Sequence, residues 1–442
     1  MTEATAVADE ARVLTIERLG GGGDGVAEVD GERWFIAGAL PGERVQARAT
    51  ARTRDGVHAE LVRIDAPAVD RIAPPCPHFR DARAPCGGCS LQHLASAPYA
   101  AFKRDLITTA LRHRGLESVA PPVAEPVITP PHSRRRVGLS AVGTYEGAVL
   151  GFHQRRSRRV VDLQDCMIAL PAISDALPAL RTTLGAILRP GERAGVAVTA
   201  LTSGVTVELT GPARFPGRRS RVRLEELASE LDWVHVAWRA HARQAFREIV
   251  ARRPATHTFA GVEVALPYAA FLQATAEGEA AVADVACAAL ATDGGAAALA
   301  DLYAGCGSLT FRLARDGHQV AAFEGERDAV RALRRAAHDA GLAVTAERRD
   351  LERQPLSPRE LNRFDGVVFD PPRAGARATA AALARSTVPR VVAVSCHPGT
   401  FARDARTLVD SGYRIERIQP VDQFLYSSHV ELVAVFQREG GS

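Results

Sequence analysis

The stretch Asp301-Leu302-Tyr303-Ala304-Gly305-Cys306-Gly307-Ser308 decides the fold of this 442-residue chain. It predicts an apolar strand that runs into a glycine turn and then a helix, so that backbone comes close to a ligand above the turn. Glu324 ends the next predicted strand, where a carboxylate accepts hydrogen bonds from both hydroxyls of a ribose. The pattern D-x-x-x-G-x-G differs from the dinucleotide pattern G-x-G-x-x-G and favours S-adenosylmethionine as the ligand.

Strand and helix patterns alternate from residue 263 to residue 442. The predicted strands cover residues 298–303, 319–323, 366–369 and 391–394, and the predicted helices include residues 277–291 and 327–340. A final pair of strands, residues 415–420 and 430–436, is expected to be antiparallel. This order predicts a doubly wound, Rossmann-like α/β domain whose ligands lie at the carboxyl ends of the strands.

Three further motifs stand at strand ends of this domain. Phe369-Asp370-Pro371-Pro372-Arg373 contains two prolines, which fix a turn that aims Asp370 into the cleft above the sheet. Ser395-Cys396-His397-Pro398 precedes a predicted helix start, where a thiolate is stabilised. His429-Val430-Glu431 lies on the last strand. Together these motifs place a thiol and two carboxylates beside the nucleoside site.

Methylation of a uracil ring at C5 requires this set of groups. C5 is too weak a nucleophile to take a methyl group directly, and a thiolate that adds to C6 makes C5 nucleophilic. A base must then remove the C5 proton so that the thiol is eliminated. The sequence therefore predicts uracil C5 chemistry around Cys396.

Residues 11–68 predict a small closed β-barrel, because short alternating segments are broken by glycine and proline. The glycine-rich turn at residues 20–23 and the segment Gly38-Ala39-Leu40-Pro41-Gly42-Glu43-Arg44-Val45 resemble a TRAM domain. This OB-like barrel implies RNA binding.

Four of the seven cysteines predict a metal site in residues 69–262. Cys76, Cys86 and Cys89 form a cluster with the spacing x9 and x2, and Cys166 lies far downstream. In a long chain, such clustering indicates a metal or catalysis before disulfides. Four thiolates suit Zn²⁺ or an iron–sulfur cube equally, so the spacing leaves both open. We expect an α+β central domain here, with residues 94–127 packed on the catalytic domain.

Positive charge gathers in one segment of a nearly neutral chain. The net charge is +4, whereas residues 131–160 hold seven arginines against one acid, Glu146. The alternative is a solvated charged face. Because Cys166 follows directly, a metal would clamp this predicted hairpin, and a planar guanidinium donates two hydrogen bonds to a phosphate. We therefore expect RNA contacts from Arg134, Arg135, Arg136, Arg155 and Arg156.

The combination of motifs resembles the bacterial RNA (uracil-5-)-methyltransferases. The resemblance runs from Phe271-Leu272-Gln273 through the Cys396 turn to His429-Val430-Glu431, and it implies Cys396 as nucleophile and Glu431 as base. His397 stands where the family usually has Asn. The resemblance also implies contacts to S-adenosylmethionine from Gln273, Tyr303, Ser308, Glu324, Asp350 and Asp370.

The segment Cys86-Gly87-Gly88-Cys89-Ser90-Leu91-Gln92-His93 is similar to the branch of this family that carries a [4Fe-4S] cluster. The resemblance implies Cys76, Cys86, Cys89 and Cys166 as its ligands, although the first gap is longer than the usual five residues. The cluster and the barrel together favour a uridine of 23S ribosomal RNA as the target. The alternatives are the same chemistry on a tRNA uridine and a catalytically inactive RNA-binding assembly factor.

Composition excludes several other classes. Hydrophobic residues make up 46% and charged residues 24%, which allows a large core and excludes wholesale disorder. No apolar run approaches the ~20 residues of a membrane helix, and the first residues lack the basic start of a signal peptide. We expect a cytoplasmic monomer with no obligate protein partner. Radical methylthiotransferases also carry such barrels and clusters, but they need a C-x3-C-x2-C triad that this chain lacks.

Overall fold

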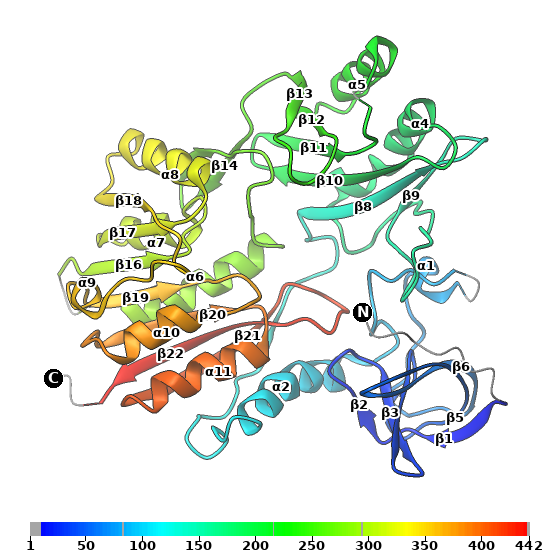
Figure 1. Cartoon of the computed structure of the whole chain (residues 1–442), viewed down its shortest axis with the longest axis horizontal. Helices are drawn as coiled ribbons and strands as arrows, with labels where there is room; N and C mark the ends of the chain where they lie inside the picture. Colours follow the sequence, from blue (N-terminus) through cyan, green and yellow to red (C-terminus); the bar gives the residue numbers. More distant parts are fainter. Residues whose placement is uncertain (1–9, 82–83, 215, 293–294, 440–442) are drawn as a thin grey trace.

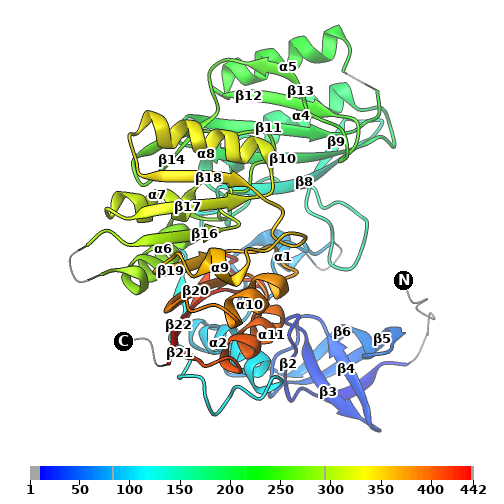
Figure 2. The ribbon, with the colours of Figure 1, turned by 60° about the vertical axis from the view of Figure 1, so that its left-hand side comes forward.

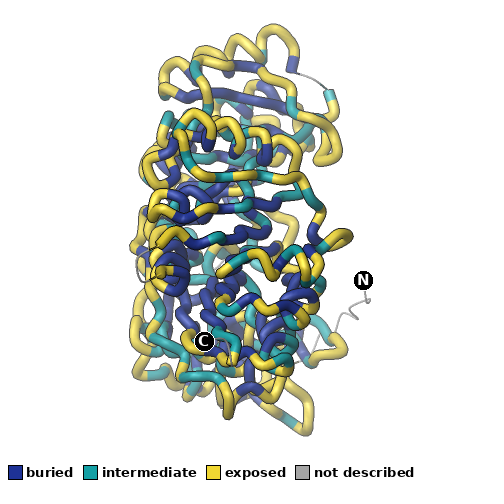
Figure 3. Tube along the Cα trace, turned by 90° about the vertical axis from the view of Figure 1, so that its left-hand side faces the viewer, coloured by how far each residue is buried: buried dark blue, intermediate teal, exposed yellow. Residues whose placement is uncertain are grey.

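The computed structural model describes residues 10–81, 84–214, 216–292 and 295–439. Three β-sheet units follow one another in the chain (Figures 1 and 2). A small barrel lies at one end, a six-stranded sheet lies at the other, and an eight-stranded sheet lies between them. The buried stretches of chain follow the inner strands of these units, whereas turns and outer helix faces are exposed (Figure 3).

The N-terminal unit is a six-stranded barrel with the strand order β1-β5-β6-β4-β3-β2. Alternate side chains of its strands point inward and enclose Trp34 and Ile36, each at most 1% exposed. Gly25 lets β3 approach the next turn, since a Cβ there would lie 2.8 Å from the carbonyl oxygen of Ala39. The strands are β1 (Arg12–Thr15), β2 (Arg18–Leu19), β3 (Gly25–Val29), β4 (Glu32–Ile36), β5 (Arg44–Thr53) and β6 (Gly56–Ala66).

The central unit is a six-stranded sheet with the order β13-β12-β11-β10-β8-β9, and helices α4 and α5 pack on it. The predicted basic segment contains the antiparallel pair β8–β9, but of its seven arginines only Arg136 lies on these strands, and the others flank them. Its strands are β8 (Arg136–Gly143), β9 (Ala148–Gly151), β10 (Arg193–Leu201), β11 (Gly204–Thr210), β12 (His235–Arg239) and β13 (Arg247–Ala251). The helices are α1 (Pro77–Arg80), α3 (Pro171–Ser174), α4 (Leu177–Ile187) and α5 (Arg218–Glu230).

The C-terminal unit is built on an eight-stranded sheet with the order β18-β17-β16-β19-β20-β22-β21-β7. The five strands from β18 to β20 are parallel, and β22 is antiparallel to both β20 and β21. This confirms the predicted doubly wound order and the final antiparallel pair. The strands are β7 (Val127–Ile128), β16 (Ala298–Leu302), β17 (Gln319–Glu324), β18 (Val344–Arg348), β19 (Gly366–Phe369), β20 (Arg390–Ser395), β21 (Tyr413–Asp422) and β22 (Glu431–Arg438).

Helices cover both faces of this sheet because its inner strands are apolar on both sides. Val367 packs with α10 and α11, whereas its neighbour Val368 packs with α6 and α7. A small hairpin, β14 (Thr256–Phe259) and β15 (Val262–Ala265), lies against α7 and α8. The helices are α6 (Ala276–Leu290), α7 (Ser308–Arg315), α8 (Arg327–Asp339), α9 (Pro358–Leu361), α10 (Arg377–Ala384) and α11 (Pro398–Val409).

One segment from the middle of the chain joins the C-terminal sheet. Helix α2 (Ser96–Arg112) packs against α11 and buries Ile107 and Leu111 in the same core. Strand β7 then pairs in parallel with the end of β21. In the described part of the chain, no helix has both the length and the apolar character needed to span a membrane.

Candidate active site

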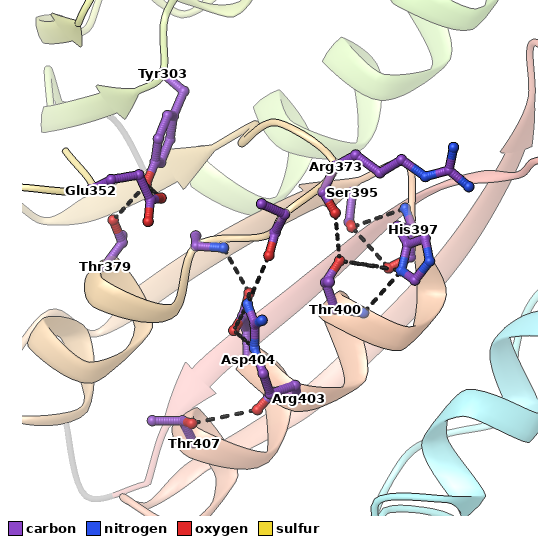
Figure 4. Close-up of polar contacts among 12 residues, drawn as sticks. Tyr303, Glu352, Arg373, Thr379, Ser395, His397, Thr400, Arg403, Asp404 and Thr407 are labelled. Atoms are coloured by element: carbon purple, nitrogen blue, oxygen red, sulfur yellow. Dashed lines mark hydrogen bonds and ion pairs between the residues drawn. The ribbon is translucent and has the colours of Figure 1, made fainter. Parts of the chain in front are cut away.

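Cys396 lies in the turn between β20 and α11. His397 caps the helix, because its Nδ1 accepts a hydrogen bond from the backbone N–H of Thr400 at 3.2 Å (Figure 4). The hydroxyl of Ser395 accepts the backbone N–H of His397 at 3.3 Å. These hydrogen bonds between neighbouring residues fix the turn. The half-buried thiol of Cys396 lies on the wall of a cleft.

The Asp370 turn is attached to the Cys396 turn through α11. The hydroxyl of Thr400 donates to the carbonyl oxygen of Arg373 at 3.3 Å, and Asp404 accepts the backbone N–H of Ala376 at 2.8 Å (Figure 4). Arg403 holds the same Asp404 carboxylate, with 2.8 Å between Nε and Oδ1. The two loops therefore form one rigid rim.

Glu431, at the start of β22, is 3% exposed and lies beside this rim. Strands β20 and β22 are adjacent and antiparallel, and Ser395 pairs with Leu432. Glu431 therefore lies opposite Cys396. Its Oε2 accepts a hydrogen bond from the Gln423 amide at 3.1 Å, whereas its buried Oε1 has no hydrogen-bond partner among the described residues. Burial, together with the charge of Asp370, raises the pKa of this carboxyl well above its usual value.

Gln423 connects the two carboxylates of the site. Its Nε2 also donates to Oε1 of Gln273 at 2.6 Å, and Gln273 donates to Asp370 at 2.8 Å. The backbone N–H of Ala274 fixes the Gln423 amide by donating to its Oε1 at 2.8 Å. Gln423 was not predicted from the sequence, because this residue follows β21 and belongs to none of the motifs. Its proximity to Glu431 in the chain was the only feature that could have indicated it.

The Cys396 thiol is harder to ionise than the sequence suggests. Burial, together with the negative charges of Glu431 and Asp370, raises its pKa to about 11 against the opposing charge of Arg373. The expected stabilisation of a thiolate at the helix start is therefore outweighed in the free protein.

The glycine turn after β16 has the strained backbone of a ligand site. Tyr303 and Gly305 adopt positive φ values of 64° and 55°. Gly307 has φ 101°, and a Cβ there would lie 2.5 Å from the Phe311 ring. Four of the predicted S-adenosylmethionine contacts line one narrow cavity beside this turn, namely Gln273, Tyr303, Ser308 and Asp370.

The two remaining predicted contacts lie differently. Glu324 is held against the glycine turn, since its Oε2 accepts the backbone N–H of Gly305 at 2.9 Å. Asp350 instead caps its own loop by accepting the backbone N–H of Glu352 at 3.2 Å, and it is not among the residues that line the cavity. The side chain of Glu352 does reach the site, because it accepts the Tyr303 hydroxyl at 2.9 Å (Figure 4).

The four cysteines predicted as metal ligands, Cys76, Cys86, Cys89 and Cys166, line one cavity of about 300 Å³. Among the described residues, however, no three His, Cys, Asp or Glu side chains are grouped so that they could hold a metal ion. Four sulfurs around zinc would lie about 3.8 Å apart, since each Zn–S bond is about 2.3 Å. The four thiols thus share one cavity, but they are not grouped as the ligands of a single ion.

The predicted RNA contact Arg135 requires a correction. This residue is 4% exposed, donates to the carbonyl oxygen of Gln273 at 2.8 Å, and pairs with Glu279 at 2.6 Å. A guanidinium buried in this way is not accessible to a phosphate of RNA. Arg135 instead ties the central sheet to the C-terminal sheet.

Three of the other four arginines of that prediction have side chains that already contact the protein itself. Arg134 lines the cysteine cavity and donates to the carbonyl oxygen of Arg136 at 2.9 Å. Arg155 and Arg156 both form ion pairs with Asp24 of the barrel. The loop that follows β9 therefore links the central unit to the barrel.

A cleft of about 1160 Å³ runs from the barrel past α2 to Cys396. Its wall contains Arg18 and Arg33 from the barrel and Arg373 from the rim, none of which has an ion-pair partner among the described residues. Sequence reasoning missed these three arginines, because they come from separate elements and form no charge run.

The fold and the site together are those of an α/β methyltransferase. A model of the tRNA (Uracil-5-)-methyltransferase family matches residues 264–439, and the TRAM domain matches residues 10–62. An uncharacterized RNA methyltransferase of Mesorhizobium japonicum is 41% identical over 429 residues, covering 96% of this chain and 98% of that protein. The 23S rRNA (uracil(1939)-C(5))-methyltransferase RlmD of Halomonas elongata is 33% identical over 451 residues, covering 98% and 91%. The chain therefore belongs to the RNA uracil-5-methyltransferase family.

A solved structure agrees with this fold. The tRNA (uracil-54, C5)-methyltransferase of Pyrococcus abyssi, in complex with S-adenosyl-L-homocysteine, superposes with a TM-score of 0.72 at 22% identity, covering 96% of this chain and all of that chain. The predicted fold class, a Rossmann-like methyltransferase preceded by a TRAM barrel, is confirmed.

Proposed function

We propose that the protein methylates C5 of a specific RNA uridine through a covalent bond between Cys396 and C6. The observation that carries this proposal is the pairing of Cys396, at the end of the cleft, with the free and buried Oε1 of Glu431. A buried carboxylate oxygen without a donor is costly to fold, and such groups gather at functional sites. Intact catalytic groups also argue against an inactive assembly factor.

Cys396 acts as the nucleophile in this mechanism. Its thiolate adds to C6, and the electron pair of the C5–C6 double bond moves onto O4 as an enolate. When bound, S-adenosylmethionine supplies a sulfonium methyl group, which C5 takes as the carbon–sulfur bond of the donor breaks. The fixed turn of Ser395 and His397 keeps the sulfur at the edge of the uracil ring.

Glu431 acts as the base that completes the reaction. Its Oε1 takes the C5 proton, the C5–C6 double bond re-forms, and the thiolate of Cys396 leaves. The raised pKa of Glu431 suits this task, because a carboxylate of ordinary pKa is a weaker base. Gln423 holds the other oxygen and so orients the carboxylate.

The glycine turn would hold the methyl donor. We assign Gln273, Tyr303, Ser308 and Asp370 to direct contacts, since they share the cavity beside the turn. Glu324 stands at the end of β17, where a carboxylate accepts bonds from ribose hydroxyls. Asp350 would not contact the methyl donor directly. It would instead hold the loop from which the Glu352 side chain reaches Tyr303.

Ribosomal RNA is the substrate that we favour. The relative named for a 23S rRNA uridine is similar over 98% of this chain, and the cleft offers arginines from barrel and rim to a phosphate backbone. A uridine has to leave its helix to reach Cys396. A tRNA uridine is the second candidate, because the solved structure with the same fold is named for one.

We further propose that Cys76, Cys86, Cys89 and Cys166 hold a [4Fe-4S] cluster, because four thiols share one cavity larger than a single ion needs. The cluster would hold the segment before α2 to the central sheet. Anaerobically purified protein should contain about four iron atoms per chain, and Cys86→Ser should lose them. Stoichiometric zinc in place of iron would contradict the cluster.

Mapping 5-methyluridine tests the function itself. Ribosomal and transfer RNA from cells without the protein should lack one 5-methyluridine that the purified protein restores in vitro, and Cys396→Ala protein should fail to restore it. RNA with an unchanged 5-methyluridine pattern would contradict the proposal.

A further inference from the structure

A second basic surface lies away from the cleft, on α8 and β18. Its exposed arginines line a groove of about 580 Å³ whose floor contains Val330. We call it the α8 groove, and its arginines are Arg327, Arg331, Arg334, Arg335 and Arg348. Figures 1 and 2 show α8 and β18 at one margin of the eight-stranded sheet, far from α2 and the barrel.

The protein itself neutralises little of this charge. Arg331 and Arg335 have only long, exposed pairs at 3.7 Å with acids of their own helix. Arg327, Arg334 and Arg348 have no carboxylate partner among the described residues. Arginines spaced four residues apart on one helix repel one another, so the fold gains nothing from this arrangement.

Two of the guanidinium groups are held in place without being neutralised. Nε of Arg334 donates to the carbonyl oxygen of Ala346 at 2.6 Å, and Nε of Arg348 donates to that of Gly325 at 3.1 Å. These bonds leave the terminal nitrogens of both side chains with no partner in the described part of the chain. Fixed guanidinium groups with free donors suit bidentate contacts to phosphates.

One end of the α8 groove, at Arg327 and Arg348, lies at the same edge of the sheet as the active site. Arg348 is the last residue of β18, and Cys396 follows the last residue of β20. Four strand spacings separate β18 from β20, which is about 19 Å at roughly 4.8 Å each. One folded RNA can therefore reach both places, whereas a few nucleotides held at Cys396 cannot.

We propose that the α8 groove is a second RNA-binding site, which holds the phosphate backbone of a substrate segment outside the target loop. This inference rests on the proposed function only for the identity of the ligand as the substrate RNA. It predicts that long RNA gains affinity and salt dependence from the groove and that short RNA does not.

The test compares two triple variants with the same change in charge. Arg327→Glu, Arg331→Glu and Arg335→Glu reverse the α8 groove, and Arg218→Glu, Arg219→Glu and Arg223→Glu reverse three exposed arginines of α5. The probes are an unmodified 23S ribosomal RNA transcript and an oligouridine of about four nucleotides. One OB-like barrel can bind that length, which at roughly 3.4 Å per nucleotide is too short to reach the groove from Cys396. Unchanged binding of S-adenosylhomocysteine shows that each variant is folded.

We expect the groove variant to bind the long transcript at least ~10-fold more weakly, with a salt slope smaller by roughly 2 to 3, since each lost phosphate contact removes about 0.9. Its affinity for the oligouridine should stay within about twofold. Unchanged affinity and slope, an equal loss in the α5 variant, or a wild-type protein that does not bind the transcript would each overturn the proposal. A failure of the proposed function would give a different result: the protein would not methylate the RNA, but the groove variant would still bind the long transcript more weakly.

Discussion

Lys103 and Asp422 form an ion pair in which both side chains are fully buried, with 2.8 Å between Nζ and Oδ1. Lys103 is the one lysine in a chain whose other basic residues are arginines. Its ammonium also donates to the carbonyl oxygen of His429, two residues before Glu431. Helix α2 thereby fixes the loop that carries the proposed base, and Tyr99 of the same helix donates to Asp422 as well.

Replacing Lys103 by methionine should destabilise the protein by about 3–5 kcal/mol, because the Asp422 carboxylate is left buried without its partner. Methyl transfer should fall in the protein that remains folded, since the His429 carbonyl loses its donor. Chemical denaturation and single-turnover methylation measure the two effects. The double variant Lys103→Met, Asp422→Asn should regain part of the stability, and a double variant weaker than the single one would contradict this role.

Replacing Gln423 by leucine should lower kcat roughly 10- to 100-fold, because Glu431 and Gln273 lose a shared donor worth about 1–3 kcal/mol. The control is Gln419→Leu, which removes a buried glutamine of β21 whose amide donates to the carbonyl oxygen of Glu125 instead. Equal losses of activity in the two variants at equal stability would show that Gln423 has no special role.

Alkylation of Cys396 by iodoacetamide should accelerate about 10-fold per pH unit from pH 7 to pH 9. The thiolate is the reactive form, and with a pKa of about 11 its fraction keeps rising over this whole range. Mass spectrometry of the Cys396 peptide separates this thiol from the six other cysteines. A rate that levels off below pH 8 would mean that the free protein already stabilises the thiolate.

Glu431→Gln should stall the reaction after methyl transfer, because no base removes the C5 proton. Release of methylated RNA should fall by roughly 10²–10⁴-fold, the usual contribution of a positioned base. A covalent complex between the variant and methylated RNA should accumulate on denaturing gels. Wild-type turnover in this variant would assign the base to another group.

The parts of the site that the sequence predicted are those with local signals. Gly305 and Gly307 are required by positive φ values, and the two prolines after Asp370 fix a turn, so both motifs show in the sequence alone. The roles of Cys396 and Glu431 were predicted from the chemistry of uracil C5 methylation and from the resemblance to the family. Their positions at strand ends follow from the alternation of strands and helices.

The parts that escaped prediction depend on contacts between distant segments. The hydrogen bond from Gln423 to Gln273 joins residues 150 positions apart, and no local sequence pattern predicts it. Arg135 looks like a surface charge in the sequence, whereas its partner Glu279 lies in another sheet unit. Strand β18 was missed because its sequence, VTAER, lies at the edge of the sheet and has only two half-buried apolar residues, Val344 and Ala346.

Trapping the covalent intermediate tests the central claim most directly. RNA that carries 5-fluorouridine at the target position should form a stable adduct with the protein when S-adenosylmethionine is present, because fluorine at C5 cannot leave as a proton does and the bond from Cys396 to C6 persists. We predict one RNA-linked peptide, which contains Cys396, and no adduct with Cys396→Ala protein. An adduct on another residue, or methylation of normal RNA by Cys396→Ala protein, would contradict the proposed mechanism.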